Sequence, residues 1–85
     1  MNAKEKVKLF KKIFSEAGID KKKFERIEDK CIAMSHLGFS QKDIINKLYE
    51  EVKRFIDKDS VESEQDRFNL ANILEQYDMD LDTCN

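Results

Sequence analysis

The sequence predicts an all-α protein: a compact single domain built as a bundle of about four short helices. Three observations predict this fold class. Apolar residues recur at spacings of three and four in four separate stretches, which is the period of an amphipathic helix. Both glycines fall between these stretches, and proline is absent. No stretch alternates apolar and polar residues over the length of a strand. A chain of 85 residues has room for one domain with one small core.

The first helix is expected over residues 3–17. Its apolar stripe consists of Val7, Phe10, Phe14 and Ala17. The opposite side carries Lys4, Lys8, Lys11 and Lys12. Gly18 fits the left-handed position that follows many helices, and Ile19 is placed to make the apolar contact that accompanies it.

The second helix is expected over residues 21–37, with Asp20 as its N-cap. Its inward-facing residues are Phe24, Ile27, Cys31, Met34 and Leu37. Gly38 ends this helix in the same way that Gly18 ends the first. Cys31 is expected to be a small core residue, because free cysteine is among the most buried residue types.

The third helix, expected over residues 41–56, has the strongest start signal. Ser40 and Asp43 have the spacing of a capping box, in which each side chain bonds a free backbone N–H near the helix start. The main stripe is Ile44, Leu48, Val52 and Phe55, with Ile45, Tyr49 and Ile56 beside it. This apolar width predicts a central helix that packs on two sides.

A polar linker follows at residues 57–63, and the fourth helix is expected over 63–77 with Ser60 or Ser63 as its cap. Its inward stripe is expected to be Phe68, Ala71, Leu74 and Tyr77, broadened by Leu70 and Ile73. Residues 78–85 then form an acidic tail. The alternating aspartates at its start imitate a calcium loop, but the glycine and the final glutamate of such a loop are missing, so a frayed tail is expected.

No catalytic, metal-binding or cofactor-binding motif is present, and we expect a protein that is not an enzyme and has no small-molecule substrate. The one histidine, His36, has no carboxylate three or four residues before it that would make a helical metal pair. The sequence contains no glycine-rich phosphate loop and no nucleophile elbow.

The expected compartment is the cytoplasm, with no membrane contact. No run of about 18 apolar residues exists to span a bilayer. Lysines from Lys4 to Lys12 interrupt any apolar segment that would serve for export. Cys31 and Cys84 are therefore expected to remain reduced.

Charge is separated along the chain. Residues 1–30 carry a net +4, residues 31–56 a net +1 and residues 57–85 a net −7, which together give the formal −2. Either the acidic end packs near the basic end, or each end faces a partner. The lysines of residues 4–12 could also contact nucleic acid or a membrane, but glutamates interrupt them, and a solvated lysine face is the simpler interpretation.

One local resemblance leads to an alternative function. Residues 38–44, Gly-Phe-Ser-Gln-Lys-Asp-Ile, are similar to a stretch that opens a helix in MerR-type regulators. This resemblance implies a helix-turn-helix-like element over residues 24–56 of a nucleic-acid-binding regulator, acting as a dimer. The residues that would contact nucleic acid are Gln41, Lys42, Asn46 and Lys47.

The leading hypothesis is a small protein–protein interaction module that binds a protein partner or itself, as a regulator or inhibitor. It rests on the lack of catalytic groups and on the apolar width of the third and fourth helices. The expected partner surface is Leu70, Ile73, Tyr77, Met79 and Leu81, which continue one apolar surface past what four short helices cover. The simpler alternative is that these residues close the core.

Overall fold

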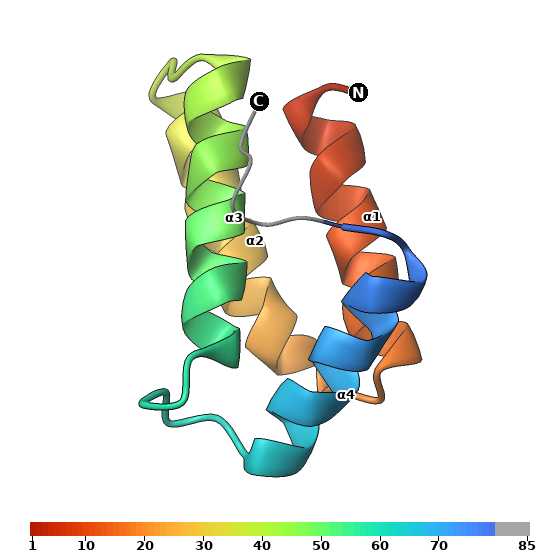
Figure 1. Cartoon of the computed structure of the whole chain (residues 1–85). Coiled ribbons are helices and arrows are strands. Elements are labelled where there is room, and N and C mark those ends of the chain that lie inside the picture. The colour runs from red at the N-terminus through yellow and green to blue at the C-terminus, as the bar shows by residue number, and fades with distance from the viewer. Residues whose placement is uncertain (80–85) are drawn as a thin grey trace.

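The computed structural model describes residues 1–79, and these residues form helices and no strand (Figure 1). The helices are α1 (Ala3–Glu16), α2 (Lys21–His36), α3 (Gln41–Ile56) and α4 (Glu64–Gln76). The predicted all-α fold class is confirmed, and each helix begins and ends within one residue of its expected range. Residues 80–85, which contain most of the expected acidic tail, lie outside the described part of the chain.

The helices α1, α2 and α3 pack against one another, and α4 packs against α1 and α3. Figure 1 shows α3 running back alongside α2 in the opposite direction. It also shows α4 at the end of the bundle where α1 ends and α2 begins. The backbones of α2 and α4, both fully described, do not approach each other. The start of α1, the end of α2 and the start of α3 meet at the other end of the molecule.

Side-chain caps start all four of these helices. Asp20, Ser40 and Ser63 each accept a hydrogen bond from a backbone N–H two or three residues further on, as the sequence predicts. The capping box predicted at Ser40 and Asp43 is half formed, since only the Ser40 bond is present, and the complete capping box lies at α1, where none was predicted. There Asn2 Oδ1 accepts from the Glu5 backbone N–H at 2.8 Å, and Glu5 Oε1 accepts from the Asn2 N–H at 3.2 Å. These bonds satisfy backbone donors that a helix start leaves free.

Three helices end in the same left-handed turn. Gly18 and Gly38 have φ angles of 74° and 85°, as expected of residues just past a helix end. The residue after each glycine donates its N–H to a carbonyl five residues back, at 3.1 Å. Ile19 is buried in this position, whereas Phe39 is 46% exposed. Leu37, which was expected on the inward face of the second helix, is 76% exposed, because it is the C-cap residue beyond the last turn of α2. The third such turn follows α4, where Asp78 takes the left-handed position with a φ of 54°.

The core is one cluster at the centre of the bundle, and aromatic rings connect its helices. Phe14 of α1 lies between Phe24 of α2, with ring centroids 4.9 Å apart, and Phe55 of α3, at 5.1 Å. Phe10 meets Tyr49 edge-on at 5.6 Å. Edge-on and tilted ring pairs of this kind add about 0.5–1.5 kcal/mol each beyond the apolar area that they bury.

The inward face of α4 differs from its prediction. Leu70 and Leu74 are buried, but Phe68 and Ala71, which were expected to face the core, are exposed. Phe68 is 64% exposed. Apolar residues are spread around this helix, so their spacing in the sequence does not indicate which face is buried. The contacts with α1 and α3 place Leu70 and Leu74, one turn apart, against the core.

Candidate interaction surface

An apolar groove opens at the end of the bundle away from α4. It has a volume of about 460 Å³ and runs between α1 and α2 to the start of α3. Its floor is formed by Ala3, Val7, Cys31 and Ile44, all of which are buried. Ile32, 47% exposed, lies on its wall. We call this the α1–α2 groove; its size is within the range of protein ligand sites, about 300–1,000 Å³.

The walls of the α1–α2 groove carry unequal charge. Lys4 and Lys8, one turn apart on α1, line one wall, and neither makes an ion pair with another described residue. Glu28 lies on the α2 wall, but its carboxylate is 3.6 Å from Lys11 Nζ and is therefore partly neutralised. His36 lies at the α2 end of the groove. The groove thus combines an apolar floor with a rim of net positive charge.

Cys31 contributes an inert thiol to the floor of the groove. Burial raises the pKa of the Cys31 thiol above its usual value, and the carboxylates of Glu51 and Glu28 raise it further. A thiol with a raised pKa stays protonated at neutral pH and is a poor nucleophile. Its contribution to the groove is therefore apolar contact.

The residues of the predicted partner surface on α4 differ in how deeply they are buried. Leu70 is fully buried, which matches the simpler alternative that it closes the core. Ile73, Tyr77 and Met79 are partly buried and pack against the core. Leu81 lies outside the described residues. The described members of this set therefore leave only part of their surface for a partner.

Tyr77 also connects α4 to α1. Its hydroxyl donates a hydrogen bond to Glu16 Oε2 at 2.7 Å. This hydrogen bond raises the pKa of the Tyr77 hydroxyl, because the carboxylate stabilises the protonated phenol. The bond crosses from the last turn of α1 to Tyr77, the C-cap residue of α4.

The predicted nucleic-acid contacts lie near the start of α3, and Gln41 is already bound within the molecule. Its side-chain Oε1 accepts a hydrogen bond from the Ala3 backbone N–H at 2.7 Å. This contact fixes the start of α1 against the start of α3 beside the groove. Lys42, the next residue, is exposed.

Asn46 and Lys47 are also turned toward the protein. Asn46 Oδ1 is buried without a hydrogen-bond partner among the described residues. Lys47 Nζ lies 3.3 Å from Glu51. In addition, α2 and α3 lie side by side in opposite directions (Figure 1). The helices of a helix-turn-helix cross at about 90–120°. The described geometry therefore does not resemble the element that the MerR-like stretch implied.

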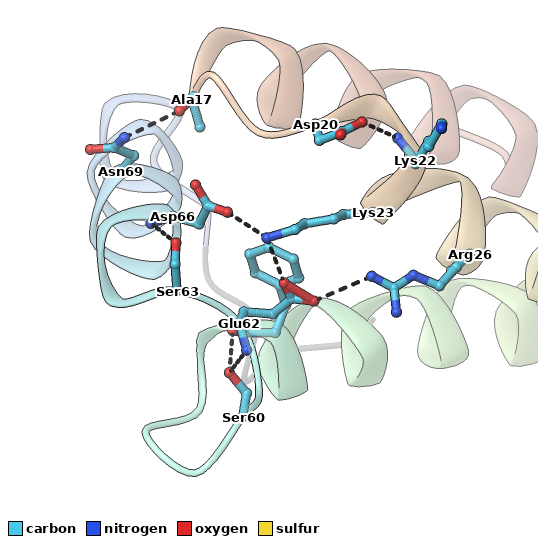
Figure 2. A network of polar contacts seen from close by, with 11 residues as sticks. Ala17, Asp20, Lys22, Lys23, Arg26, Ser60, Glu62, Ser63, Asp66 and Asn69 are labelled. Carbon is cyan, nitrogen blue, oxygen red and sulfur yellow. Dashed lines mark hydrogen bonds and ion pairs between the residues drawn. The ribbon is translucent and has the colours of Figure 1, made fainter.

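A polar network fixes the linker and α4 against α2. Figure 2 shows Lys23 reaching from α2 between the carboxylates of Glu62 and Asp66. Its Nζ is 3.0 Å from Glu62 and 2.8 Å from Asp66, and Arg26 lies 3.6 Å from Glu62. Hydrogen bonds to both carboxylates raise the pKa of the Lys23 amine. In these contacts the acidic end of the chain packs near the basic end, the first of the two arrangements that the charge separation predicts.

A second cluster, which was not predicted from the sequence, surrounds Glu51 on α3. The side chain of Glu51 is only 7% exposed, yet its carboxylate lies 2.9 Å from Lys30, 3.3 Å from Lys47 and 3.7 Å from Arg54. Burial raises the pKa of this carboxyl, but the hydrogen bonds from the two lysines outweigh it and hold the pKa below its usual value. Basic residues at three, four and 21 positions from Glu51 were the available sequence signal.

Neither a metal-binding cluster nor a membrane-spanning helix is found among the described residues. Residues 1–79 hold no group of three or more His, Cys, Asp and Glu side chains arranged to bind a metal ion. Within the same residues, no helix has the length and apolar character needed to cross a bilayer.

Comparisons with known proteins find no relative. No protein-family model, no curated protein sequence and no solved structure matches this chain. The similarity of residues 38–44 to MerR-type regulators therefore stays a local one. The geometry of the groove carries the functional argument.

Proposed function

We propose that this protein is a non-enzymatic protein–protein interaction module that receives a partner segment in the α1–α2 groove. The segment that fits is an acidic helix with at least one large apolar side chain. By binding that helix in its groove, the module acts as a regulator or inhibitor of its partner. We place it in the cytoplasm, where the buried thiol of Cys31 stays reduced.

The observation that carries this proposal is an apolar groove whose wall is partly uncovered. Ile32 leaves 47% of its surface exposed beside a floor that is already buried. Covering that surface with a partner contributes about 1 kcal/mol, and an apolar side chain from the partner adds about 1.5–3 kcal/mol. Lys4 and Lys8 on the rim favour a partner with carboxylates and steer its approach.

The nucleic-acid alternative has less support. Gln41 and Lys47 are engaged within the protein, and Lys47 lies beside Glu51. The chain has a formal charge of −2, whereas nucleic-acid-binding domains are usually strongly basic. An apolar groove is also a poor surface for phosphates, which prefer cations and backbone N–H groups.

The proposal is tested by capture from a lysate of the source organism with three baits: wild type, Ile32→Glu and Lys12→Glu. Ile32→Glu places a carboxylate on the groove wall at a half-exposed position. Lys12→Glu makes a larger charge change on α1 but lies outside the groove. We expect a protein that survives nuclease treatment, is captured by wild type and Lys12→Glu, and is lost with Ile32→Glu.

Two outcomes would contradict the proposal. Equal capture by wild type and Ile32→Glu would show that the groove is not the binding surface. Capture that disappears with nuclease, and with the double variant Lys42→Glu and Lys47→Glu, would instead support the nucleic-acid alternative. Circular dichroism of each bait confirms that the helices are intact.

A further inference from the structure

The outer face of α4 has the chemistry that the α1–α2 groove requires. This face consists of Glu64, Phe68, Ala71 and Glu75, all exposed and spaced so that they form one stripe along the helix. Phe68 is 64% exposed although it is a large apolar side chain. Neither Glu64 nor Glu75 makes an ion pair with another described residue. An exposed aromatic side chain thus lies between two carboxylates that have no such partner.

The groove and this stripe are complementary in charge and in polarity. Lys4 and Lys8 line the groove without carboxylate partners among the described residues, while Glu64 and Glu75 flank Phe68 without cationic ones. A groove of about 460 Å³ with an apolar floor accepts an aromatic side chain. Opposite charges on the two surfaces would attract each other, whereas two copies of the same surface would repel.

The two surfaces lie at opposite ends of the molecule. The groove is formed by the start of α1, the end of α2 and the start of α3. Figure 1 shows α4 at the other end, beside the turn between α1 and α2. The contacts of α4 with α1 and α3, and the hydrogen bond from Asn69 to the Ala17 carbonyl at 3.3 Å, hold it there. The outer face of α4 therefore cannot fill the groove of its own chain.

We infer that the groove binds the outer face of α4 from a second copy of this chain, with Phe68 inserted beside Ile32 and the glutamates near Lys4 and Lys8. This inference rests on the proposed function and names the partner. The two contacting surfaces are different, so the association is head-to-tail. Each dimer leaves one groove and one α4 face open, and copies can add further to form a chain or a ring.

The experiment is sedimentation velocity of the full chain from about 10 µM to about 1 mM, at low and at high salt. Wild type is expected to form a concentration-dependent series of oligomers that dissociate as salt screens the charges. Phe68→Glu, which blocks the α4 face, and Lys8→Glu with Ile32→Glu, which blocks the groove, should each be monomeric. Lys12→Glu is the control and should associate within about twofold of wild type.

Mixing the two blocked variants gives the decisive result. One retains an intact groove and the other an intact α4 face, so the mixture should form a 1:1 dimer and nothing larger. A monomeric wild type, oligomers that persist in Phe68→Glu, or a mixture that stays monomeric would each overturn the inference. The two proposals can fail separately: a monomeric wild type that still captures another protein through Ile32 would overturn the second-copy inference and leave the groove function standing.

Discussion

Asp78 occupies a backbone conformation that glycine adopts at lower cost. It follows the C-cap residue of α4 with a φ of 54°, and its N–H and that of Met79 donate to the carbonyls of Glu75 and Leu74, each at 3.0 Å. Gly18 and Gly38 serve the two corresponding positions elsewhere in the molecule. A side chain in the left-handed region is strained, and a negative charge at a helix C-terminus is unfavourable.

We therefore expect Asp78→Gly to raise the free energy of unfolding by about 0.5–1 kcal/mol, net of the extra freedom that glycine has in the unfolded chain. Asparagine adopts the left-handed conformation about as readily as aspartate and carries no charge. Asp78→Asn should therefore raise the free energy of unfolding by only a few tenths of a kcal/mol. Asp78→Ala should destabilise. Urea unfolding of the three variants measures the order of their stabilities. Equal changes in the free energy of unfolding for Asp78→Gly and Asp78→Ala would show that the turn is unstrained.

Glu51 is a buried carboxylate whose three cationic neighbours are partly or largely exposed. Replacing its carboxylate with an amide, as in Glu51→Gln, removes charge-assisted hydrogen bonds with little change in shape. We expect a loss of about 1–3 kcal/mol near neutral pH. The control is Glu50→Gln: its side chain is 56% exposed, and its pair with Arg54 should be worth less than about 1 kcal/mol.

The Glu51 effect should also depend on pH. Its pKa is held below the usual value in the folded protein, so its charge stabilises the fold above the unfolded-state pKa of about 4.3. This stabilisation is lost as the pH falls through the lower, folded-state pKa. Wild type and Glu51→Gln should therefore differ most near neutral pH and converge in acid. A difference that is independent of pH would show that packing, rather than charge, connects Glu51 to its neighbours.

At the scale of the helices, α4 is attached differently from the other three. Its backbone does not approach that of α2, and Lys23 of α2 pairs with Asp66 of α4 and with Glu62 of the linker before it. Local unfolding is easiest where few buried contacts must break. We expect α4 to open more readily than the rest of the bundle.

Lys23→Met tests this attachment, because it keeps the aliphatic stem and removes the charge. Amide hydrogens of residues 64–76 should exchange faster in this variant, with little change in α1, α2 and α3. Lys22→Met is the matched control: Lys22 is exposed and makes no ion pair with another described residue. A uniform increase in exchange across all four helices would show that α4 unfolds only with the whole molecule.

The helices could be predicted from local sequence, whereas the face of α4 and the groove could not. Gly18, Gly38, Ser40 and Ser63 start or stop helices through bonds within a few residues, so their spacing is visible along the chain. Phe68 was assigned to the core because its spacing from Ala71 fits one of several apolar stripes on this helix. Only the packing of α4 on α1 and α3 decides between these stripes.

The groove could not be predicted from the sequence for a related reason. Its lining comes from residues 3–8, 28–36 and 41–44, which meet only after three helices have packed. Each helix pattern predicts a buried stripe but not the angle at which neighbouring helices leave a gap. Glu51 was missed partly for the same reason, since Lys30 reaches it from another helix, whereas Lys47 and Arg54 lie on its own helix and were visible in the sequence. Side-chain contacts between helices are set by tertiary packing, which a single sequence does not display.

At the scale of the whole molecule, one aromatic side chain connects three helices of a small core. Phe14 is 1% exposed and contacts Phe24 and Phe55. A domain of 85 residues has a free energy of unfolding of about 4–13 kcal/mol. Replacing a buried phenylalanine with alanine costs about 3–5 kcal/mol, which is a large part of that total. Stability should therefore depend on this residue more than on any single ion pair.

We expect Phe14→Ala to destabilise α1, α2 and α3 together, since rings from all three helices meet at Phe14. Its urea transition should move to much lower concentration and be the same by circular dichroism and by tyrosine fluorescence, as for a two-state change. Phe39→Ala, at a ring that is 46% exposed, is the control and should cost less than about 1 kcal/mol. Two separated transitions in Phe14→Ala would show that the bundle folds as independent parts, and the core would then not be the single unit that connects the groove to α4.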